Sequence, residues 1–563
     1  MTGLKTVEAK PHTPVYKMHK YFARRPWNVF RELILLHAAL GEIILDPFMG
    51  GGVTVVESLR LRRKVVGIDL NPLAEFITRM EVSPLDTDRF QEARKIIASR
   101  IKNEIQSFYV TECPDCGMTA HADWLEWNEA ERKITRIKFD CTHCDRSGTK
   151  APLLDDTELT ERIDDKFDAT IRERGLWFPK TQVPQGDKTS SLLNSGITHF
   201  YQLYTRRNLL ALAILLREIN QADPVTRDFL KFTFSSCLKW CSRQSHLRGS
   251  IVEGWAMHAY WVYPKSLELN VWNTLERRFD AVIRGKRFSN EEIGNFYKPA
   301  KEFDELKRDA SCLLLSRSSS NLPLPANSVD AIITDPPYGG NVNYGELADY
   351  WWIWLNDGKM IEKDEEAVIN RTQRKSIREY EERLASIFNE CFRVLKPGGP
   401  FVSTFNSKNA AVVTAFITAA ARAGFVIDAK GISYQAPIKA YTTTFHAMQV
   451  GAFVGDFIFT FTKPIRSQRI VSTGSVDDIA EFKNELGDII SKGIKYDMTD
   501  AQLREVAYKH LIPYVAAHTS TPDNCGKATE FFESKMRKSS THFKNRRRSI
   551  IEVRRRTFRR TRI

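Results

Sequence analysis

The chain has 563 residues, of which 42% are hydrophobic and 27% charged, a composition that excludes a wholly disordered protein. Its length allows roughly two to four domains with cores of their own. No apolar run approaches the ~20 residues of a membrane-spanning helix, and the longest, around Leu33–Leu40, is interrupted by His37. The first residues lack the apolar segment of a secretory signal. We therefore expect a cytoplasmic protein without a membrane association.

The net charge of +14 is concentrated at the C-terminus. Ser534–Ile563 contains 13 Lys and Arg residues and one acid, whereas the rest of the chain is nearly neutral. Clustered guanidinium groups neutralise phosphates and release counterions, so this tail is suited to binding nucleic acid. A solvated end without a specific partner has the same composition. Charge alone does not decide between these two interpretations.

The first 85 residues predict a βαβ unit. A buried strand at Glu42–Asp46 runs into the glycine-rich stretch 47–52, and a helix is expected over Val53–Leu61. A second buried strand, Lys64–Asp69, ends in an acid and is followed by a helix near Leu73–Met80. This order of strand, glycine-rich turn, helix and strand is typical of an open α/β sheet.

A long insert interrupts this pattern before the buried strands return. Residues 86–309 contain a charged helical stretch, four paired cysteines and further helical segments. Seven strands are predicted in total, two before the insert and five after it, at 312–315, 329–334, 399–405, 425–433 and 456–462. We expect an α/β fold in which one Rossmann-like sheet is split by the insert. The expected regions are 1–85 and 310–465 for the sheet domain, 86–309 for the insert, 466–520 for a helical appendage and 521–563 for the basic tail.

The glycine-rich stretch lies where an open α/β sheet binds its ligand, after the first strand. Glycines allow the backbone to turn sharply and to approach a ligand closely. Asp69, at the end of the next strand, is placed to accept hydrogen bonds from two ribose hydroxyls. The spacing differs from that of an ATP-hydrolysing phosphate loop. The loop and the acid together favour a nucleoside-containing cofactor over a purely structural turn.

A second motif, Asp335-Pro336-Pro337-Tyr338, follows the predicted strand Val329–Thr334. The prolines have no backbone N–H, so their carbonyls, like the aspartate carboxylate, only accept hydrogen bonds. Beside a flat tyrosine ring, such acceptors suit an amino group on a planar ring. When these acceptors take hydrogen bonds from both N–H groups of the amine, the nitrogen lone pair becomes free to attack an electrophile. The alternative is a proline-stiffened turn, but the pairing with the glycine loop favours the functional interpretation.

Together, the glycine loop and Asp-Pro-Pro-Tyr resemble the signature pair of amino-group DNA methyltransferases that use S-adenosylmethionine. His19–Pro26 is similar to the cofactor-side N-terminal motif of that family. The similarity also includes Asn343–Leu347, the aromatic run Tyr350–Trp354, and Val394–Gly399, a turn that many methyltransferases share. The similar segments cover somewhat over half of the chain. The resemblance implies a seven-stranded methyltransferase sheet.

The resemblance also implies roles for the residues of the first motif. Phe48, Gly50 and Gly52 would line the methionine end of S-adenosylmethionine, Asp46 would lie near its amino group, and Asp69 would hold its ribose. The residues expected to bind this cofactor are Lys20, Asp46, Pro47, Phe48, Gly50, Gly52, Asp69 and Asn71. One segment departs from the family pattern, because Ser316–Pro323 stands where relatives often carry an acid that contacts the adenine ring.

By the same resemblance, the catalytic residues are Asp335, Pro336, Pro337 and Tyr338. Asp335 and the Pro336 carbonyl would bind the target amine, and Tyr338 would stack on a base flipped out of the DNA duplex. Methyl transfer is an in-line displacement in which positioning supplies much of the acceleration. In this family, Asp at the first position goes more often with adenine N6 and Ser with cytosine N4, so adenine is favoured.

Two Cys-x-x-Cys pairs predict a metal site in the insert. The pairs are separated by 24 residues, and four thiolates close a tetrahedral structural zinc site. Trp124–Phe139 is expected to form the hairpin of a zinc ribbon at about 110–148. A redox role is the alternative for a single pair. The predicted ligands are Cys113, Cys116, Cys141 and Cys144.

The predicted function is a site-specific DNA methyltransferase that transfers a methyl group from S-adenosylmethionine to an exocyclic base amine, with adenine N6 favoured. The resemblance implies a restriction-modification or phage-defence setting, with subunits of such a system as partners beside duplex DNA. The insert is the expected target-recognition region, because it lies between the two motifs. The alternatives are an N4-cytosine enzyme, an RNA base amino-methyltransferase and a catalytically silent nucleic-acid-binding subunit.

Overall fold

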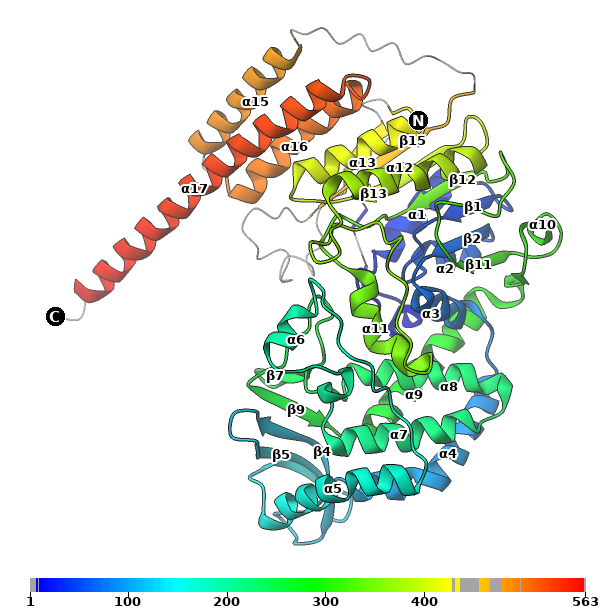
Figure 1. Ribbon diagram of the computed structural model, residues 1–563, viewed down its shortest axis with the longest axis vertical. Helices are drawn as coiled ribbons and strands as arrows, with labels where there is room; N and C mark the ends of the chain where they lie inside the picture. Colours follow the sequence, from blue (N-terminus) through cyan, green and yellow to red (C-terminus); the bar gives the residue numbers. More distant parts are fainter. Residues whose placement is uncertain are drawn as a thin grey trace.

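The computed structural model describes residues 7–8, 10–427, 431–435, 455–465, 478–496 and 498–560, with side chains up to residue 541. Its main sheet has eight strands in the order β10-β11-β2-β1-β12-β13-β15-β14 (Figure 1). Neighbouring strands are parallel from β10 to β13, and β15 and β14 are antiparallel. The strands are β1 (Ile43–Asp46), β2 (Lys64–Asp69), β10 (Pro299–Ala300), β11 (Cys312–Ser316), β12 (Ala331–Thr334), β13 (Pro400–Phe405), β14 (Ile432–Gln435) and β15 (Asp456–Thr462).

The sheet contains one strand more than the sequence predicts. Each of the seven predicted segments contains a strand of this sheet, and the eighth is the two-residue β10 at its edge. Two residues are too few for a periodic pattern, so β10 is identified only by its pairing with β11. The predicted strand 425–433 is replaced by β14, which begins at Ile432, and residues 428–430 lie outside the described part of the chain.

Helices cover both faces of the sheet because its central strands are apolar on both sides. Ile44 and Val65 belong to one hydrophobic core, whereas the adjacent Leu45 and Val66 belong to the other. Helices α1 to α3 pack in the first core and α10, α12 and α13 in the second. These helices are α1 (Trp27–His37), α2 (Val53–Arg60), α3 (Pro72–Val82), α10 (Phe303–Leu306), α12 (Ile377–Val394) and α13 (Ala410–Arg422).

The helices of the insert share the first core of the sheet. Buried residues of the insert helices α7, α8 and α9, and of α11 outside the insert, lie in the same apolar cluster as Ile44. Lys286 of α9 donates to the carbonyl oxygens of Met80 and Glu81 at 3.0 Å, which ties the insert to α3. The helices of the insert are α4 (Thr87–Ser107), α5 (Leu154–Glu173), α6 (Ser190–Asn194), η2 (Phe200–Leu203), α7 (Arg206–Asn220), α8 (Pro224–Leu238), α9 (Val271–Glu292) and η3 (Gly294–Phe296). Two further helices, η1 (Pro14–Lys17) and α11 (Tyr344–Leu355), lie outside it.

A second, smaller sheet lies at the end of the insert far from α13 (Figure 1). Strands β3 to β6 follow one another in antiparallel order, and β9 pairs with β4. The hairpin of β4 and β5 lies where the sequence predicts one. The strands are β3 (Val110–Glu112), β4 (Thr119–Asn128), β5 (Lys133–Cys141), β6 (Arg146–Lys150) and β9 (Lys265–Leu269), and β7 (His246–Arg248) pairs separately with β8 (Ile251–Glu253).

Three helices follow at the C-terminal end, α15 (Asp478–Lys495), α16 (Asp500–Ala517) and α17 (Pro522–Arg560). Helices α16 and α17 pack against α13, and α15 packs against α16 and α17. Cys525, Ala528, Phe532 and Met536 of α17 are buried in the second core. Beyond this contact α17 extends away from the rest of the molecule (Figure 1). Within the described ranges, every helix is too short or too polar to cross a bilayer.

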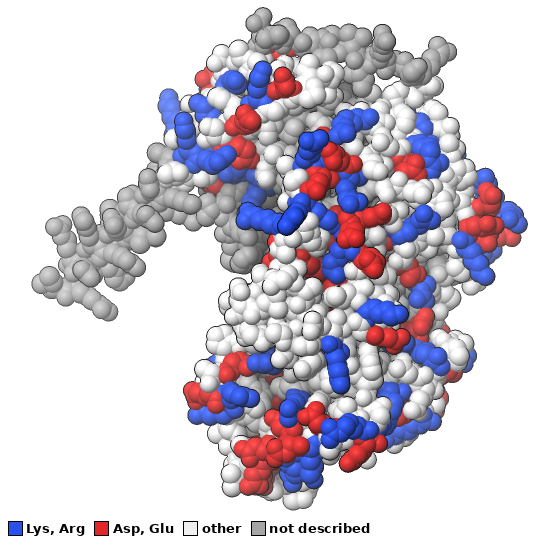
Figure 2. Space-filling model, in the orientation of Figure 1, with Lys and Arg blue, Asp and Glu red and all other residues white. Residues whose placement is uncertain are grey.

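Charged side chains of both signs are interspersed over the face of the molecule shown in Figure 2. Charged residues of the described chain form ion pairs, such as Arg393 with Glu390 at 2.7 Å and Arg378 with Glu382 at 2.9 Å. This mixture is expected for a body that is nearly neutral once the C-terminal tail is set aside.

Candidate active site

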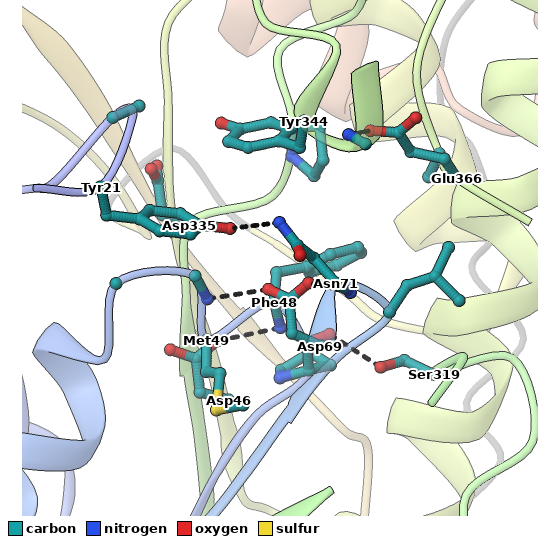
Figure 3. A pocket seen from close by; sticks show the side chains of 18 of the residues that line it. Tyr21, Asp46, Phe48, Met49, Asp69, Asn71, Ser319, Asp335, Tyr344 and Glu366 are labelled. Carbon is teal, nitrogen blue, oxygen red and sulfur yellow. Dashed lines mark hydrogen bonds between the residues drawn. The ribbon is translucent and has the colours of Figure 1, made fainter. Parts of the chain in front are cut away.

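A cavity of about 970 Å³, including its open mouth, lies at the carboxyl ends of β1, β2 and β12 (Figure 3). Leu45 pairs in parallel with both Val66 and Ile332, so these three strands end at the same edge of the sheet. The cavity therefore joins two regions that the insert separates in sequence. The predicted site residues that line it are Asp46, Pro47, Phe48, Gly50, Asp69, Asn71, Asp335 and Pro337.

The glycine loop is shaped by left-handed backbone and by close neighbours. Gly50 and Gly52 have φ values of +47° and +73°, a region that favours glycine. A Cβ atom at Gly52 would lie 2.6 Å from Thr78 Oγ1 on α3. The Met49 amide donates to the carbonyl of Ile68 at 3.0 Å, which holds the loop against β2. Helix α2 then begins directly after Gly52.

Two carboxyl groups, the buried Asp46 and the half-buried Asp69, hold this loop. Asp69 accepts from the amides of Gly50 and Asn71 at 2.9 and 2.8 Å, and Asp46 accepts from the Phe48 amide at 3.1 Å and from Thr334 Oγ1 at 2.6 Å. Burial raises the pKa of Asp69 to about 6 and that of Asp46 to about 7. A carboxylate oxygen has room for a second donor, so Asp69 can still accept from a ligand hydroxyl.

The N-terminal segment 19–26 contributes four residues to the cavity lining, Tyr21, Ala23, Arg24 and Arg25. A Cβ atom at Gly50 would lie 3.2 Å from the Tyr21 ring, and the Tyr21 hydroxyl accepts from Asn71 Nδ2 at 3.4 Å (Figure 3). Arg24 pairs with the buried Glu81 at 2.7 Å. Lys20 is exposed and does not line the cavity, in contrast to the expectation from the motif.

Asp335 has three hydrogen-bonding partners. Arg25 Nε donates to Oδ2 at 2.6 Å, and the hydroxyls of Tyr338 and Thr404 both bond to Oδ1. Burial raises the pKa of Asp335 to about 6, although the Arg25 guanidinium opposes that effect. The acceptor that the sequence assigns to the target amine is therefore already engaged on both oxygens.

The rest of the Asp-Pro-Pro-Tyr motif is held by the second core. Tyr380 of α12 donates to the Pro337 carbonyl at 2.6 Å, and the Tyr338 ring lies 4.8 Å from the ring of Phe405. Tyr338, Pro336 and Gly52 are not among the residues that line the cavity, but each adjoins one that is.

Arg25, Thr404 and Asp456 are the contacts that sequence reasoning missed. Arg25 belongs to a segment that resembles a family motif, but nothing in the sequence links it to Asp335. Arg25 Nη1 also lies 3.2 Å from both carboxylate oxygens of Asp456, at the start of β15. Thr404 is on β13, the sheet neighbour of β12. Only the order of the strands brings these residues together.

The serine-rich segment supplies no acid to the cavity. Ser318 and Ser319 line it, but the Ser319 hydroxyl donates to the Pro47 carbonyl at 2.7 Å. Acids come instead from the loop before α12, which contributes Glu362, Glu365 and Glu366. The sequence held no signal for this placement.

Glu366 is the buried member of these three acids. Its side chain is among those drawn in the cavity wall in Figure 3. Its Oε1 atom accepts from the Gly345 amide at 2.9 Å. Its Oε2 atom is buried and has no hydrogen-bonding partner among the described residues. Burial raises the pKa of this carboxyl group to about 7. An unpartnered buried oxygen in the wall of a cavity is suited to accept from a ligand donor.

The four predicted metal-binding cysteines meet in the small sheet. All four Sγ atoms lie within 4.8 Å of one another, with separations of 3.7 Å for Cys113 to Cys144 and 3.8 Å for Cys116 to Cys141. A disulfide needs about 2.05 Å, whereas a tetrahedron with Zn–S bonds of about 2.3 Å has edges of about 3.8 Å. The donor set therefore fits a four-coordinate zinc ion.

Comparison with known proteins gives two matches. The DNA methylase family, which comprises N6 and N4 methyltransferases, matches residues 4–78 and 329–468. The Type II methyltransferase M.MjaII of Methanocaldococcus jannaschii is 19% identical over 420 residues, covering 70% of this chain and 72% of that protein. The two family segments contain the glycine loop and Asp335, the two sides of the cavity. The resemblance predicted from the two motifs is thereby confirmed.

Proposed function

We propose that this chain, which is similar to the DNA methylase family on both sides of its insert, transfers a methyl group from S-adenosylmethionine to an exocyclic amine in DNA. One observation carries the proposal. The glycine loop and Asp69 line the same cavity as Asp335, so a methyl donor on one side faces an amine acceptor on the other. Adenine N6 is the favoured target, because in the family that this chain resembles an Asp at the first motif position goes more often with adenine N6.

The residues present fit S-adenosylmethionine, which supplies a methyl group made electrophilic by its sulfonium. The left-handed glycine loop offers a wall without Cβ atoms. Asp69 retains acceptor capacity for ribose hydroxyls, and Glu366 Oε2 offers a further buried acceptor. Asp46, Phe48 and Asn71 complete the expected contacts on that side.

On the target side, this chain binds and orients the amine. Asp335 accepts one N–H group of the amine, and the Pro336 carbonyl accepts the other. Tyr338 stacks on the flipped base, held in place by its contact with Phe405. An amine held by these two acceptors is positioned for in-line displacement.

The test is methyl transfer from tritiated S-adenosylmethionine to unmodified genomic DNA, with total RNA in parallel. We expect label in DNA as N6-methyladenine. If the product is N4-methylcytosine instead, the target base is cytosine and the proposed reaction, methyl transfer to an exocyclic amine in DNA, still holds. Label in RNA alone, or no label despite measurable cofactor binding, would contradict the proposed function.

Zinc is the proposed occupant of the four-cysteine cluster, with a structural role. Four thiolates leave no open coordination position, and Gly117 and Asp145, which follow the two knuckles, both adopt positive φ values. Metal analysis of the purified protein should give one zinc per chain, and Cys116→Ser should lower it sharply. We further propose that the insert recognises the target sequence, and that the protein serves a restriction-modification or phage-defence system.

A further inference from the structure

Arg25 lies where a flipped base is expected. Its guanidinium carbon is 4.7 Å from the centre of the Tyr338 ring, over the face of that ring. Its Nε atom donates to Asp335 Oδ2 at 2.6 Å. The side chain is largely shielded from solvent, with 19% of its surface exposed. Arg25 therefore makes a stacking contact and a hydrogen bond at the same time.

These two contacts match the requirements of a target base. A flipped base presents a flat π-face to Tyr338 and an N–H group to Asp335, and a guanidinium is likewise planar and carries N–H donors. The two occupants compete for the same ring face and the same carboxylate oxygen. While Arg25 lies over that ring face and donates to Oδ2, a base cannot take the same position.

The structure also offers a place for the displaced guanidinium. Moving a buried charge away from its partner is costly unless another partner is available. Arg25 Nη1 already lies 3.2 Å from both oxygens of Asp456, whose side chain is 19% exposed. A small rotation of the side chain would release Asp335 and keep the ion pair with Asp456.

Arg25 is also the partner of Asp335 that can leave most easily. Thr404 is fixed on the central strand β13, and Tyr338 belongs to the motif itself. Arg25 precedes α1 in an irregular segment, and its long side chain reaches the cavity from outside the sheet.

We propose that Arg25 occupies the place of the target base until the base enters, and that Asp456 then receives the guanidinium. This inference rests on the proposed function and adds a positioning residue to it. While the site is empty, Arg25 keeps the Asp335 carboxylate ionised and oriented. When the base arrives, the exchange exposes that carboxylate to the amine.

The test uses base flipping by the full-length protein. The methylated sequence is first mapped on DNA modified by the wild type, and a duplex with 2-aminopurine at the target position is then titrated at pH 8 with S-adenosylhomocysteine present. We expect Arg25→Ala to lower the DNA concentration for half-maximal fluorescence by about tenfold, the order of one charge-assisted hydrogen bond. Asp456→Asn should raise it, because Arg25 then loses its second partner. Arg89→Gln, a surface charge change away from the cavity, should leave it unchanged.

The opposite signs separate displacement from a structural role. If Arg25→Ala and Asp456→Asn both weaken flipping, or neither changes it, the inference is wrong while methylation by the wild type stands. If the wild type methylates no DNA, the proposed function fails and the inference with it. Should Arg25→Ala not fold, Arg25→Lys replaces it, and stronger flipping is again expected because an ammonium lacks the planar face.

Discussion

Four acids that line the cavity share one property, a carboxyl group whose pKa is raised by burial. The pKa is about 6 for Asp69 and Asp335 and about 7 for Asp46 and Glu366. Burial makes the charged form of each acid less stable than it is in water. A hydrogen-bond donor that binds to the carboxylate stabilises this charged form again. The cavity is thus prepared for ligands that bring N–H and O–H groups.

The pKa of Asp335 predicts how methyl transfer depends on pH. Below about pH 6 this carboxyl group becomes protonated and can no longer accept both from the amine and from its neighbours. Single-turnover rates at saturating cofactor should therefore fall as the pH is lowered through 6. Asp335→Asn should lower the rate at pH 8 on the order of 100-fold and remove this dependence.

Cofactor binding provides the control for Asp335→Asn. Asp335 and the glycine loop lie at different strand ends, so the affinity for S-adenosylmethionine, measured by calorimetry, should stay close to that of the wild type. A variant with near-normal turnover would show that Asp335 does not bind the amine.

Glu366 predicts a contact with the bound cofactor. Its unpartnered Oε2 atom lies in the cavity wall, so a ligand donor at that point should bind to it. Glu366→Gln should weaken S-adenosylmethionine binding by about tenfold, because a charge-assisted hydrogen bond becomes neutral. Glu362→Gln is the matched control, since Glu362 lines the same cavity but is exposed. Equal affinities for both variants would contradict the contact.

At the scale of elements, the glycine loop that connects β1 to α2 shapes the part of the cavity proposed to bind the cofactor. Gly52 ends the loop with φ +73° and packs against Thr78 of α3. Gly41, in the turn before β1, has a similar φ of +79°, but no atom of the described residues lies within 4 Å of the point that a Cβ atom would occupy there. The two glycines therefore have similar backbone conformations and different surroundings.

This difference predicts unequal effects of alanine. Gly41→Ala should lower the free energy of unfolding by about 1 kcal/mol through left-handed strain alone. Gly52→Ala should lower it further and weaken cofactor binding, because the added methyl group meets Thr78. Urea denaturation and calorimetry measure the two effects. Equal losses of stability, with unchanged cofactor binding, would show that the packing of the loop on α3 is unimportant.

The smaller sheet, which carries the four cysteines, connects to the rest of the insert through the pairing of β4 with β9. Leu125 and Trp127 of β4 pair with Glu268 and Ser266 of β9, and β9 leads directly into α9. Removing zinc should disorder the sheet around the cysteines and lower the affinity for DNA more than that for cofactor. Cys116→Ser tests this by filter binding and calorimetry, with Cys237→Ala as the control outside the cluster. Equal loss of both affinities would contradict a separate role.

At the scale of the whole molecule, most of the net positive charge lies beyond the packed body. The first part of α17 is anchored by Phe532 and Met536, whereas residues 542–563 contribute ten Lys and Arg residues and one acid. Each phosphate that a cation neutralises adds to the salt dependence of binding. The tail is therefore expected to add affinity for nucleic acid without sequence specificity.

Truncation after Thr541 tests the tail. The variant keeps the buried part of α17, so its thermal stability should match that of the full chain. Its DNA affinity, measured by fluorescence anisotropy, should be lower at low salt and fall less steeply as salt is raised. Turnover at saturating DNA should be unchanged. Identical salt slopes for both proteins would show that the tail does not contact DNA.

Much of the cofactor side was predictable from the sequence. The strands before the glycine loop and Asp69 are short apolar runs, and the rule that ligands bind at strand carboxyl ends places both residues at one edge. The four cysteines were predictable for a similar reason, since their spacing is set by local knuckles. Lys20 shows the limit of a motif, because its neighbours Tyr21 and Arg25 line the cavity while it faces solvent.

The sequence by itself determined the buried strands, the two motifs at their ends and the cysteine pairs, because each depends on residues close together in the chain. Only the tertiary structure decided that Arg25 binds Asp335 and Asp456, that Glu366 has an unpartnered oxygen, and that the insert shares the core of the sheet. The two contacts of Arg25 join residues more than 300 positions apart. They depend on strand order and on the packing of whole elements, which no local pattern of residues encodes.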